Sequence, residues 1–112
     1  MFESTRRYYL YNCPVDMRKS FNTLCGVVRH KMNMEIQENV GYVFINKRAT
    51  HMKILCWEGD GLSIYYKRLE QGTFEHPDQG PDYRISYEKL LLILRGISIQ
   101  KIIKRKRYKL GG

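Results

Sequence analysis

Basic side chains are the residues best suited to chemistry in this sequence, and the chemistry they suit is phosphate binding. Lys47 and Arg48 are adjacent, and His51 and Lys53 follow within a few positions, between stretches rich in aromatic and branched residues. Long cationic side chains at the tip and start of a hairpin can reach a nucleic-acid backbone while the strands hold them in place. An ordinary solvated surface explains the same residues equally well, so both interpretations stay open.

A second basic cluster lies at the C-terminal end and carries most of the net charge. The chain has 112 residues, with 20 Lys and Arg against 11 Asp and Glu, a formal net charge of +9 and a pI near 9.6. Residues 101–109 contain six Lys and Arg and no Asp or Glu. A run of bases like this favours contact with a polyanion over the role of a solubilising terminus. It lacks the Trp or Phe anchors of a membrane-surface helix. Without the six bases of this cluster the net charge of the chain would be only +3. The bases are Lys101, Lys104, Arg105, Lys106, Arg107 and Lys109, and Tyr108 lies among them as a candidate stacking side chain.

Two shorter basic pairs complete the candidate contacts. Lys67 and Arg68 follow two tyrosines in a predicted strand, where they are also explained as outward-facing strand residues. Arg18 and Lys19 follow Asp16 at a predicted helix start, and a helix N-terminus with adjacent bases presents amide groups and positive charge to a phosphate. A capped helix start with solvent-facing bases is the equal alternative.

Patterns for catalysis, metal binding or a cofactor are not found. Gly59-Asp60-Gly61 falls in a predicted hairpin and lacks the Lys-Ser/Thr of a phosphate loop. The acidic residues have ready roles as cap, turn and loop residues, and the histidines, which are widely spaced, lack ligand partners at i+3 or i+4. We therefore expect a binding protein with no catalytic residue, no metal site and no cofactor; a nuclease is the weakest alternative. The histidines are His30, His51 and His76.

The elements that position these residues follow from hydrophobic spacing. A short aromatic run predicts a strand over residues 8–11. An amphipathic helix should follow, with Asp16 as its N-cap. Its apolar face is predicted from Met17, Phe21, Leu24, Val28 and Met32.

From residue 41 the hydrophobic period changes to two. This predicts a β-meander of strands over 42–45, 52–57 and 62–68, with Asp60-Gly61 as a hairpin turn. Ser86 should cap a second helix over 87–95 that ends at Gly96, while 97–103 fit either a strand or a helical turn. The predicted fold class is α+β: a small antiparallel sheet, made of the meander and the N-terminal strand, packed with an amphipathic helix and a second, C-terminal helix. We expect a single domain over 1–100 and a basic C-terminal tail over 101–112.

We expect a cytoplasmic protein. A hydrophobic fraction of 43% is enough for a packed core and argues against disorder. The longest aliphatic run, residues 90–94, is far shorter than the roughly 20 residues of a membrane span. Three widely spaced cysteines form neither a disulfide framework nor a zinc pattern, and Cys25 and Cys56 lie in apolar patterns typical of a core.

Several segments together are similar to a known family. Residues 13–21 resemble its opening signature, Gly-Pro-Thr-Asp-Met-Arg-Lys followed by a small and an apolar residue, with Cys13 and Val15 in place of the usual Gly and Thr. Further matches are residues 43–48, 53–55, 57–61 and 65–70, Gly72, Phe74, 91–92 and 96–97. Over 8–103 the chain thus resembles the TnpB accessory protein, the product of the second open reading frame of bacterial insertion sequences of the sixty-six family.

The resemblance implies a role in DNA transposition of a mobile genetic element, beside a separate, larger transposase that carries the acidic catalytic residues. We expect a non-catalytic accessory protein that binds DNA, the transposase or both through basic surfaces; the alternative is a module that contacts the transposase without binding DNA. The residues predicted to contact DNA are Arg18, Lys19, Lys47, Arg48, Lys53, Lys67, Arg68, Lys101, Lys104, Arg105, Lys106, Arg107 and Lys109.

Overall fold

The computed structural model of the chain describes residues 3–77 and 82–96. Three predictions lie outside the described residues: the conformation of 97–103, the domain boundary at residue 100, and the basic tail over 101–112 with its six candidate DNA contacts.

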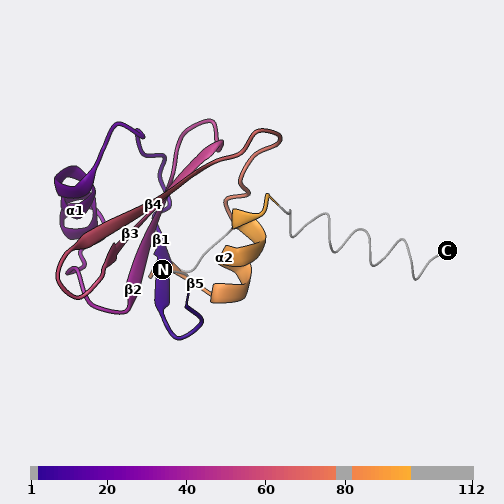
Figure 1. The fold of residues 1–112 in the computed structure, drawn as a ribbon. Helices are drawn as coiled ribbons and strands as arrows, with labels where there is room; N and C mark the ends of the chain where they lie inside the picture. The colour runs from indigo at the N-terminus through magenta and orange to yellow at the C-terminus, as the bar shows by residue number, and fades with distance from the viewer. Residues whose placement is uncertain (1–2, 78–81, 97–112) are drawn as a thin grey trace.

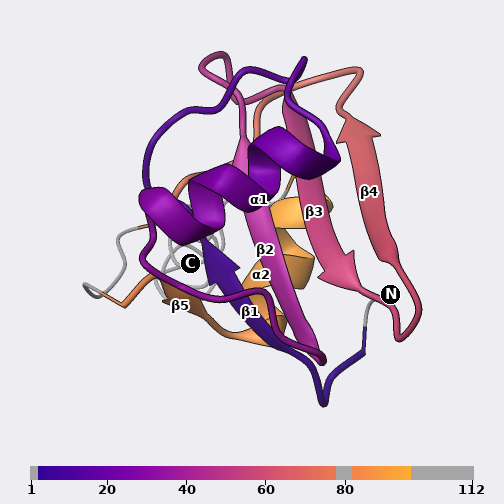
Figure 2. The same cartoon turned by 90° about the vertical axis from the view of Figure 1, so that its left-hand side faces the viewer.

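Five strands form one sheet in the order β4-β3-β2-β1-β5, and a helix lies on each face (Figure 1). Figure 2 shows α1 crossing in front of the strands and α2 behind them. The α+β class, the meander and both helices are confirmed, whereas the short β5 was not predicted. The elements are β1 (Arg7–Leu10), α1 (Phe21–His30), β2 (Val40–Ile45), β3 (His51–Trp57), β4 (Leu62–Arg68), β5 (Arg84–Ile85) and α2 (Tyr87–Leu94).

The direction of β1 corrects the predicted sheet, which is mixed rather than antiparallel throughout. β1 pairs with β2 in parallel, with Arg7 opposite Val40 and Leu10 opposite Val43. Parallel neighbours need a crossover connection, and α1 supplies it between the two strands. The consequence is positional: β1 and β2 finish at the same end of the sheet, so the segment after β1 begins beside the β2–β3 turn.

The start of α1 also differs from the prediction. Ser20, not Asp16, is the N-cap, and the Ser20 backbone N–H donates to Thr23 Oγ1 at 2.8 Å. Asp16 instead accepts the backbone N–H of Arg18 at 2.9 Å, because a short carboxylate readily closes a turn onto the amide two residues later. The residues from 16 to 19 are therefore a turn before the helix, and the helix begins one turn later than predicted.

Alternating side chains divide the core between the two faces of the sheet. On the α1 face, Leu24 and Val28 pack against Phe44 and Leu55. On the α2 face the core includes Leu10, Val43, Ile54, Leu90 and Ile93. Phe21, predicted on the apolar face of α1, is 43% exposed.

Gly41 in β2 permits a close approach that the sheet requires. A Cβ at this position would lie 2.6 Å from a ring carbon of Tyr8 on β1 and 3.3 Å from the side chain of Ile54. Since Tyr8 is almost fully buried, its ring has little room to give way. The absence of a side chain at position 41 is thus part of how β1 packs beside β2.

The start and end of α2 follow the prediction. The Ser86 side chain accepts the Lys89 backbone N–H at 3.2 Å, which caps the helix, and Gly96 follows the helix in a left-handed conformation with φ of 71°. The helix packs its apolar residues on the sheet face opposite α1.

Candidate nucleic-acid interface

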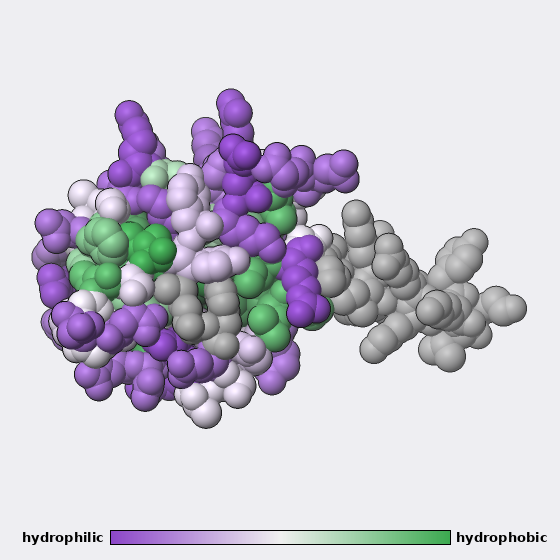
Figure 3. Space-filling view, viewed as in Figure 1, coloured by the Kyte–Doolittle hydropathy of each residue, from purple (hydrophilic) through white to green (hydrophobic). Residues whose placement is uncertain are grey.

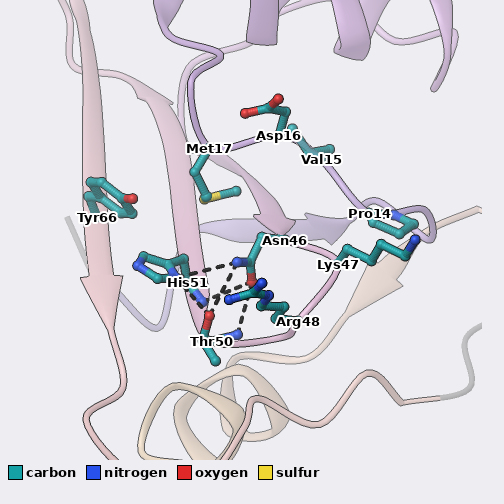
Figure 4. Close-up of a pocket in the computed structure, with 10 residues that line it drawn as sticks. All are labelled: Pro14, Val15, Asp16, Met17, Asn46, Lys47, Arg48, Thr50, His51 and Tyr66. Atoms are coloured by element: carbon teal, nitrogen blue, oxygen red, sulfur yellow. Dashed lines mark hydrogen bonds between the residues drawn. The ribbon is translucent and has the colours of Figure 1, made fainter.

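A cavity of about 510 Å³ lies at the end of the sheet where β1 and β2 finish, hereafter the end cavity. Its walls come from residues 14–17, residues 46–48, 50 and 51, and Tyr66 of β4 (Figure 4). The parallel direction of β1 brings the first two segments together, and the Val15 N–H donates to the Ile45 carbonyl at 3.0 Å. The end cavity therefore joins two motifs that the sequence predicted separately, the Asp16 turn and the basic hairpin.

Lys53 holds the first of these segments in place. Its side chain is on the α1 face of β3, only 8% of the residue is exposed, and its Nζ donates to the carbonyls of Met17 at 2.7 Å and Lys19 at 2.8 Å. A buried ammonium with two carbonyl partners cannot reach a phosphate in solution without losing both bonds. In the structure Lys53 thus anchors the turn before α1, and its contact with DNA stays a prediction that would require these two hydrogen bonds to break.

Asn46 organises the second wall. Its Oδ1 accepts the backbone N–H groups of Thr50 at 2.9 Å and His51 at 3.0 Å, and its Nδ2 donates to the Thr50 hydroxyl at 3.2 Å. The Thr50 hydroxyl also lies 2.7 Å from His51 Nδ1, and Ala49 closes the turn with φ of 57°. Figure 4 shows this network as dashed lines at the base of the cavity. The two bases between Asn46 and Ala49 are thus carried on a turn with a defined shape.

Lys47 and Arg48, the bases on this turn, are exposed and line the end cavity. The ion pairs found among residues 3–77 and 82–96 involve other bases. Neither side chain is therefore paired with an acidic residue in the described part of the chain, and both expose a positive charge to solvent.

The Asp16 turn contributes a paired charge to the same cavity. Arg18, 91% of whose side chain is exposed, places its Nη2 2.7 Å from Asp16 Oδ2. Hydrogen bonds from the Arg18 side chain and backbone lower the pKa of Asp16 to about 2. Arg18 thus reaches solvent with its charge largely matched, and the neighbouring Lys19 is half-buried.

The third basic pair, Lys67 and Arg68, has its two side chains on opposite faces of β4. Arg68 is exposed and its Nη2 lies 2.8 Å from Glu70 Oε1. Lys67 faces the opposite side of the sheet, where its Nζ donates at 2.7 Å to the Leu94 carbonyl at the end of α2. Adjacent strand residues point to opposite faces, so the two side chains point away from each other and Lys67 caps the C-terminal end of α2. Their contacts with DNA stay a prediction.

Tyr66 is a member of the site that the sequence reasoning did not select. It is 52% exposed, lines the end cavity and has Lys53 Nζ 4.8 Å from its ring centroid. Asn46 and Thr50 were also missed. The signal for Asn46 was its place before a basic turn, since Asn commonly closes such turns with its side chain; Tyr66 could be found only from its register opposite Lys53.

The remaining chemistry-bearing residues are dispersed. Within residues 3–77 and 82–96, no group of three or more His, Cys, Asp or Glu lies close enough together to hold a metal ion. Cys25 and Cys56 are buried, as predicted, while Cys13 is exposed, and burial raises the pKa of the Cys56 thiol to about 11. None of the helices in the described part of the chain is long and apolar enough to cross a membrane.

The fold is that of a small α+β protein, in which the Asp16 turn and the basic hairpin turn both line the end cavity. The chain belongs to the family described as IS66 Orf2 like protein, whose sequence model matches residues 6–104. The resemblance drawn from the sequence is thereby confirmed, and the chain is an accessory protein associated with transposition of insertion sequences.

Two similar proteins from Sinorhizobium fredii carry no assigned function. Uncharacterized protein y4jC is 29% identical over 97 residues, which cover 86% of this chain and 82% of the relative. Uncharacterized protein y4hO is 27% identical over 92 residues, covering 81% and 80% of the two chains. No solved structure matches the sequence.

Proposed function

We propose that this protein binds DNA at the ends of its insertion sequence through the end cavity, and so assists the transposase of the same element. The observation that carries the proposal is the meeting of the residues 14–17 segment with a turn that presents Lys47 and Arg48 without described acidic partners. Because the turn is organised by Asn46, these side chains are displayed from a rigid base, which lowers the entropy cost of holding a phosphate.

The tail over 101–112 is proposed to add non-specific attachment. Its six bases have no acid among them, so they attract a polyanion whatever its sequence. The body then supplies the shaped site and the tail supplies general affinity. We propose that the protein acts in the bacterial cytoplasm, where the element's DNA lies.

Salt-dependent binding to duplexes with the element's terminal inverted repeats tests the proposal. Each neutralised phosphate contributes about −0.9 to the slope of log K against log salt. Six tail contacts therefore predict a slope of about −5, and loss of two further contacts in the Lys47→Ala/Arg48→Ala variant should make the slope shallower by about 1.8. Scrambled duplexes report the non-specific share of affinity.

A matched control removes two exposed bases elsewhere. Lys31 follows α1 and Arg84 lies on β5, at the other edge of the sheet from β4. Lys31→Ala/Arg84→Ala changes net charge equally but should leave the slope unchanged. A slope that falls equally in both double variants, or a flat salt response of the unaltered protein, contradicts the proposed site.

Direct contact with the transposase is the second candidate, and an apolar hollow favours it. A cavity of about 250 Å³ lies between α1 and the β3–β4 hairpin, and its walls include Ile36, Trp57 and Leu62. Figure 3 shows hydrophobic residues gathered beside α1 and along α2. If this hollow binds the transposase, the two proteins should co-purify after nuclease treatment, and Ile36→Ser should weaken that association while Lys47→Ala/Arg48→Ala does not.

The proposed role is non-catalytic. Incubation of DNA with the protein in magnesium or manganese should give no cleavage. Metal-dependent cleavage that is lost in Asp16→Ala, or in Glu58→Ala and Asp60→Ala at the β3–β4 hairpin, would show instead that the protein is a nuclease.

A further inference from the structure

Tyr66 stands between two hollows on the α1 face of the sheet. It lines the end cavity, and it also lines a second cavity of about 280 Å³ formed with His51, Arg68 and Glu70. At 52% exposure it is more open than Phe21, the other large hydrophobic residue exposed in the described part of the chain. An aromatic ring left this open at the junction of two cavities is available to a ligand.

The ring is also held in place. Tyr66 is opposite Lys53 in the β3–β4 register, and Lys53 Nζ lies 4.8 Å from the ring centroid. The His51 imidazole centroid is 5.8 Å from the same ring at an interplanar angle of 43°. His51 is in turn oriented by the Thr50 hydroxyl at 2.7 Å. A ring fixed by two neighbours on a sheet has little freedom left to lose when something stacks on it.

Positive charge flanks the ring on both sides. Lys47 and Arg48 line the end cavity, and Arg68 lines the other. Glu70 pairs with Arg68 at 2.8 Å, but both side chains are mostly exposed, and such surface pairs separate at little cost. An aromatic platform between cations is the arrangement with which proteins bind single-stranded nucleic acid, because bases stack on the ring while the backbone follows the charges.

We propose that Tyr66 stacks on an unpaired base of DNA, so that the protein prefers single-stranded or unstacked nucleotides over intact duplex at this position. The inference rests on the proposed DNA binding and adds the state of the DNA that is recognised. In an intact duplex the faces of the bases are covered by their neighbours, and only phosphates and groove edges are offered to the protein. Lys47 and Arg48 can meet either form, whereas the Tyr66 ring can be used only by an exposed base.

The test uses the full chain and three DNA hairpins of one stem sequence. The first is blunt, the second has a short single-stranded thymidine overhang, and the third has the same overhang with abasic sugars, which keep the phosphates and remove the bases. The unaltered protein should bind the thymidine overhang more tightly than the abasic one by roughly 5- to 150-fold, the range that a single stacked base gives on removal of an aromatic residue.

Variants separate stacking from other roles of the ring. Tyr66→Ala should abolish the preference for the thymidine overhang over the abasic overhang, while Tyr66→Phe should retain this preference because the ring is kept. Phe21→Ala removes the other exposed aromatic residue of the described part of the chain and should leave the preference unchanged. Thermal unfolding of each variant confirms that Tyr66→Ala is folded, as expected for a half-exposed residue.

The failures are distinguishable. If the protein binds blunt hairpins but does not separate thymidine from abasic overhangs, stacking is overturned and DNA binding stands. If no hairpin is bound, the proposed function is overturned together with this inference. If Tyr66→Ala weakens all three probes equally, or affects only co-purification with the transposase, the ring serves the shape of the cavity or a protein contact and the inference is wrong.

Discussion

Replacing Lys53 by Met should unfold the segment before α1 and destabilise the whole domain. The change keeps a flexible apolar chain but removes the ammonium that donates to the Met17 and Lys19 carbonyls. Two hydrogen bonds from a charged donor, at about 1.5–3 kcal/mol each, set an upper limit of about 6 kcal/mol. Relief of the buried charge offsets part of this loss. The expected decrease in the free energy of unfolding is therefore about 2–4 kcal/mol.

Urea unfolding measures this loss, which should appear as a lower midpoint with an unchanged m-value. Trypsin supplies a local readout, because the released segment contains Arg18 and Lys19 as cleavage sites. Native Lys53→Met protein should be cut there faster than the unaltered protein. DNA affinity, measured where the variant is folded, should fall indirectly through loss of one wall of the end cavity.

Lys47→Met is the matched control, since it removes the same charge from the same hairpin at an exposed position. It should leave the free energy of unfolding within about 0.5 kcal/mol of the unaltered value. Its slope of log K against log salt should be shallower by about 0.9. The anchoring role is refuted if Lys53→Met leaves the free energy of unfolding unchanged and makes the slope of log K against log salt shallower. Lys53 would then contact phosphate.

Three further predictions concern stability and reactivity. Gly41→Ala should lower the free energy of unfolding by about 1–3 kcal/mol, because the new methyl group overlaps a buried tyrosine ring, while Gly61→Ala, which meets nothing within 4 Å, serves as the neutral control in the same thermal melts. Thiol labelling of the folded protein at pH 8 should modify Cys13 and spare Cys56, whose pKa is raised to about 11 by burial; equal rates would contradict the burial. The lowered pKa of Asp16 means that its carboxylate stabilises the fold above the ordinary value of 3.8 and that this contribution is lost as pH falls through about 2. The difference in urea midpoint between the unaltered protein and Asp16→Asn should vanish across that interval, and a difference that persists at lower pH would refute the assignment.

Local patterns were sufficient to predict most elements. Alternation over residues 42–68 predicted three strands, and the Asp60-Gly61 turn between two of them is present, with the Glu58 N–H donating to the Gly61 carbonyl at 2.7 Å. Ser86 and Gly96 marked the ends of α2 because caps depend on neighbouring residues only. β5 was not predicted because a strand of two residues is too short to show an alternating hydrophobic pattern.

Asp16 shows where local reasoning fails. A carboxylate before an apolar helical pattern fits an N-cap, yet the same side chain can close a turn onto the amide two residues later, and both options are local. In the structure Asp16 closes the turn, and Lys53 and Ile45 hold residues 15–19 against the sheet by hydrogen bonds. The contacts that hold this segment come from residues at least 30 positions further along the chain, which local reasoning does not take into account.

The sequence by itself determined the α+β class, the meander, the two helices and the family, because these depend on hydrophobic period, turn residues and motif order. It also determined that positive charge is concentrated at the hairpin and the tail. It did not determine which hairpin bases meet solvent: Lys47 is exposed and Lys53 is buried, although both carry the same charge in the same motif.

Only the tertiary structure decided how the motifs meet. The direction of β1 places residues 14–17 beside the 46–51 turn, and an antiparallel β1 would have put them at opposite ends of the sheet. Strand direction depends on pairing between residues more than thirty positions apart, whereas period and caps depend on close neighbours. The end cavity, the anchoring role of Lys53 and the open ring of Tyr66 all follow from that long-range pairing.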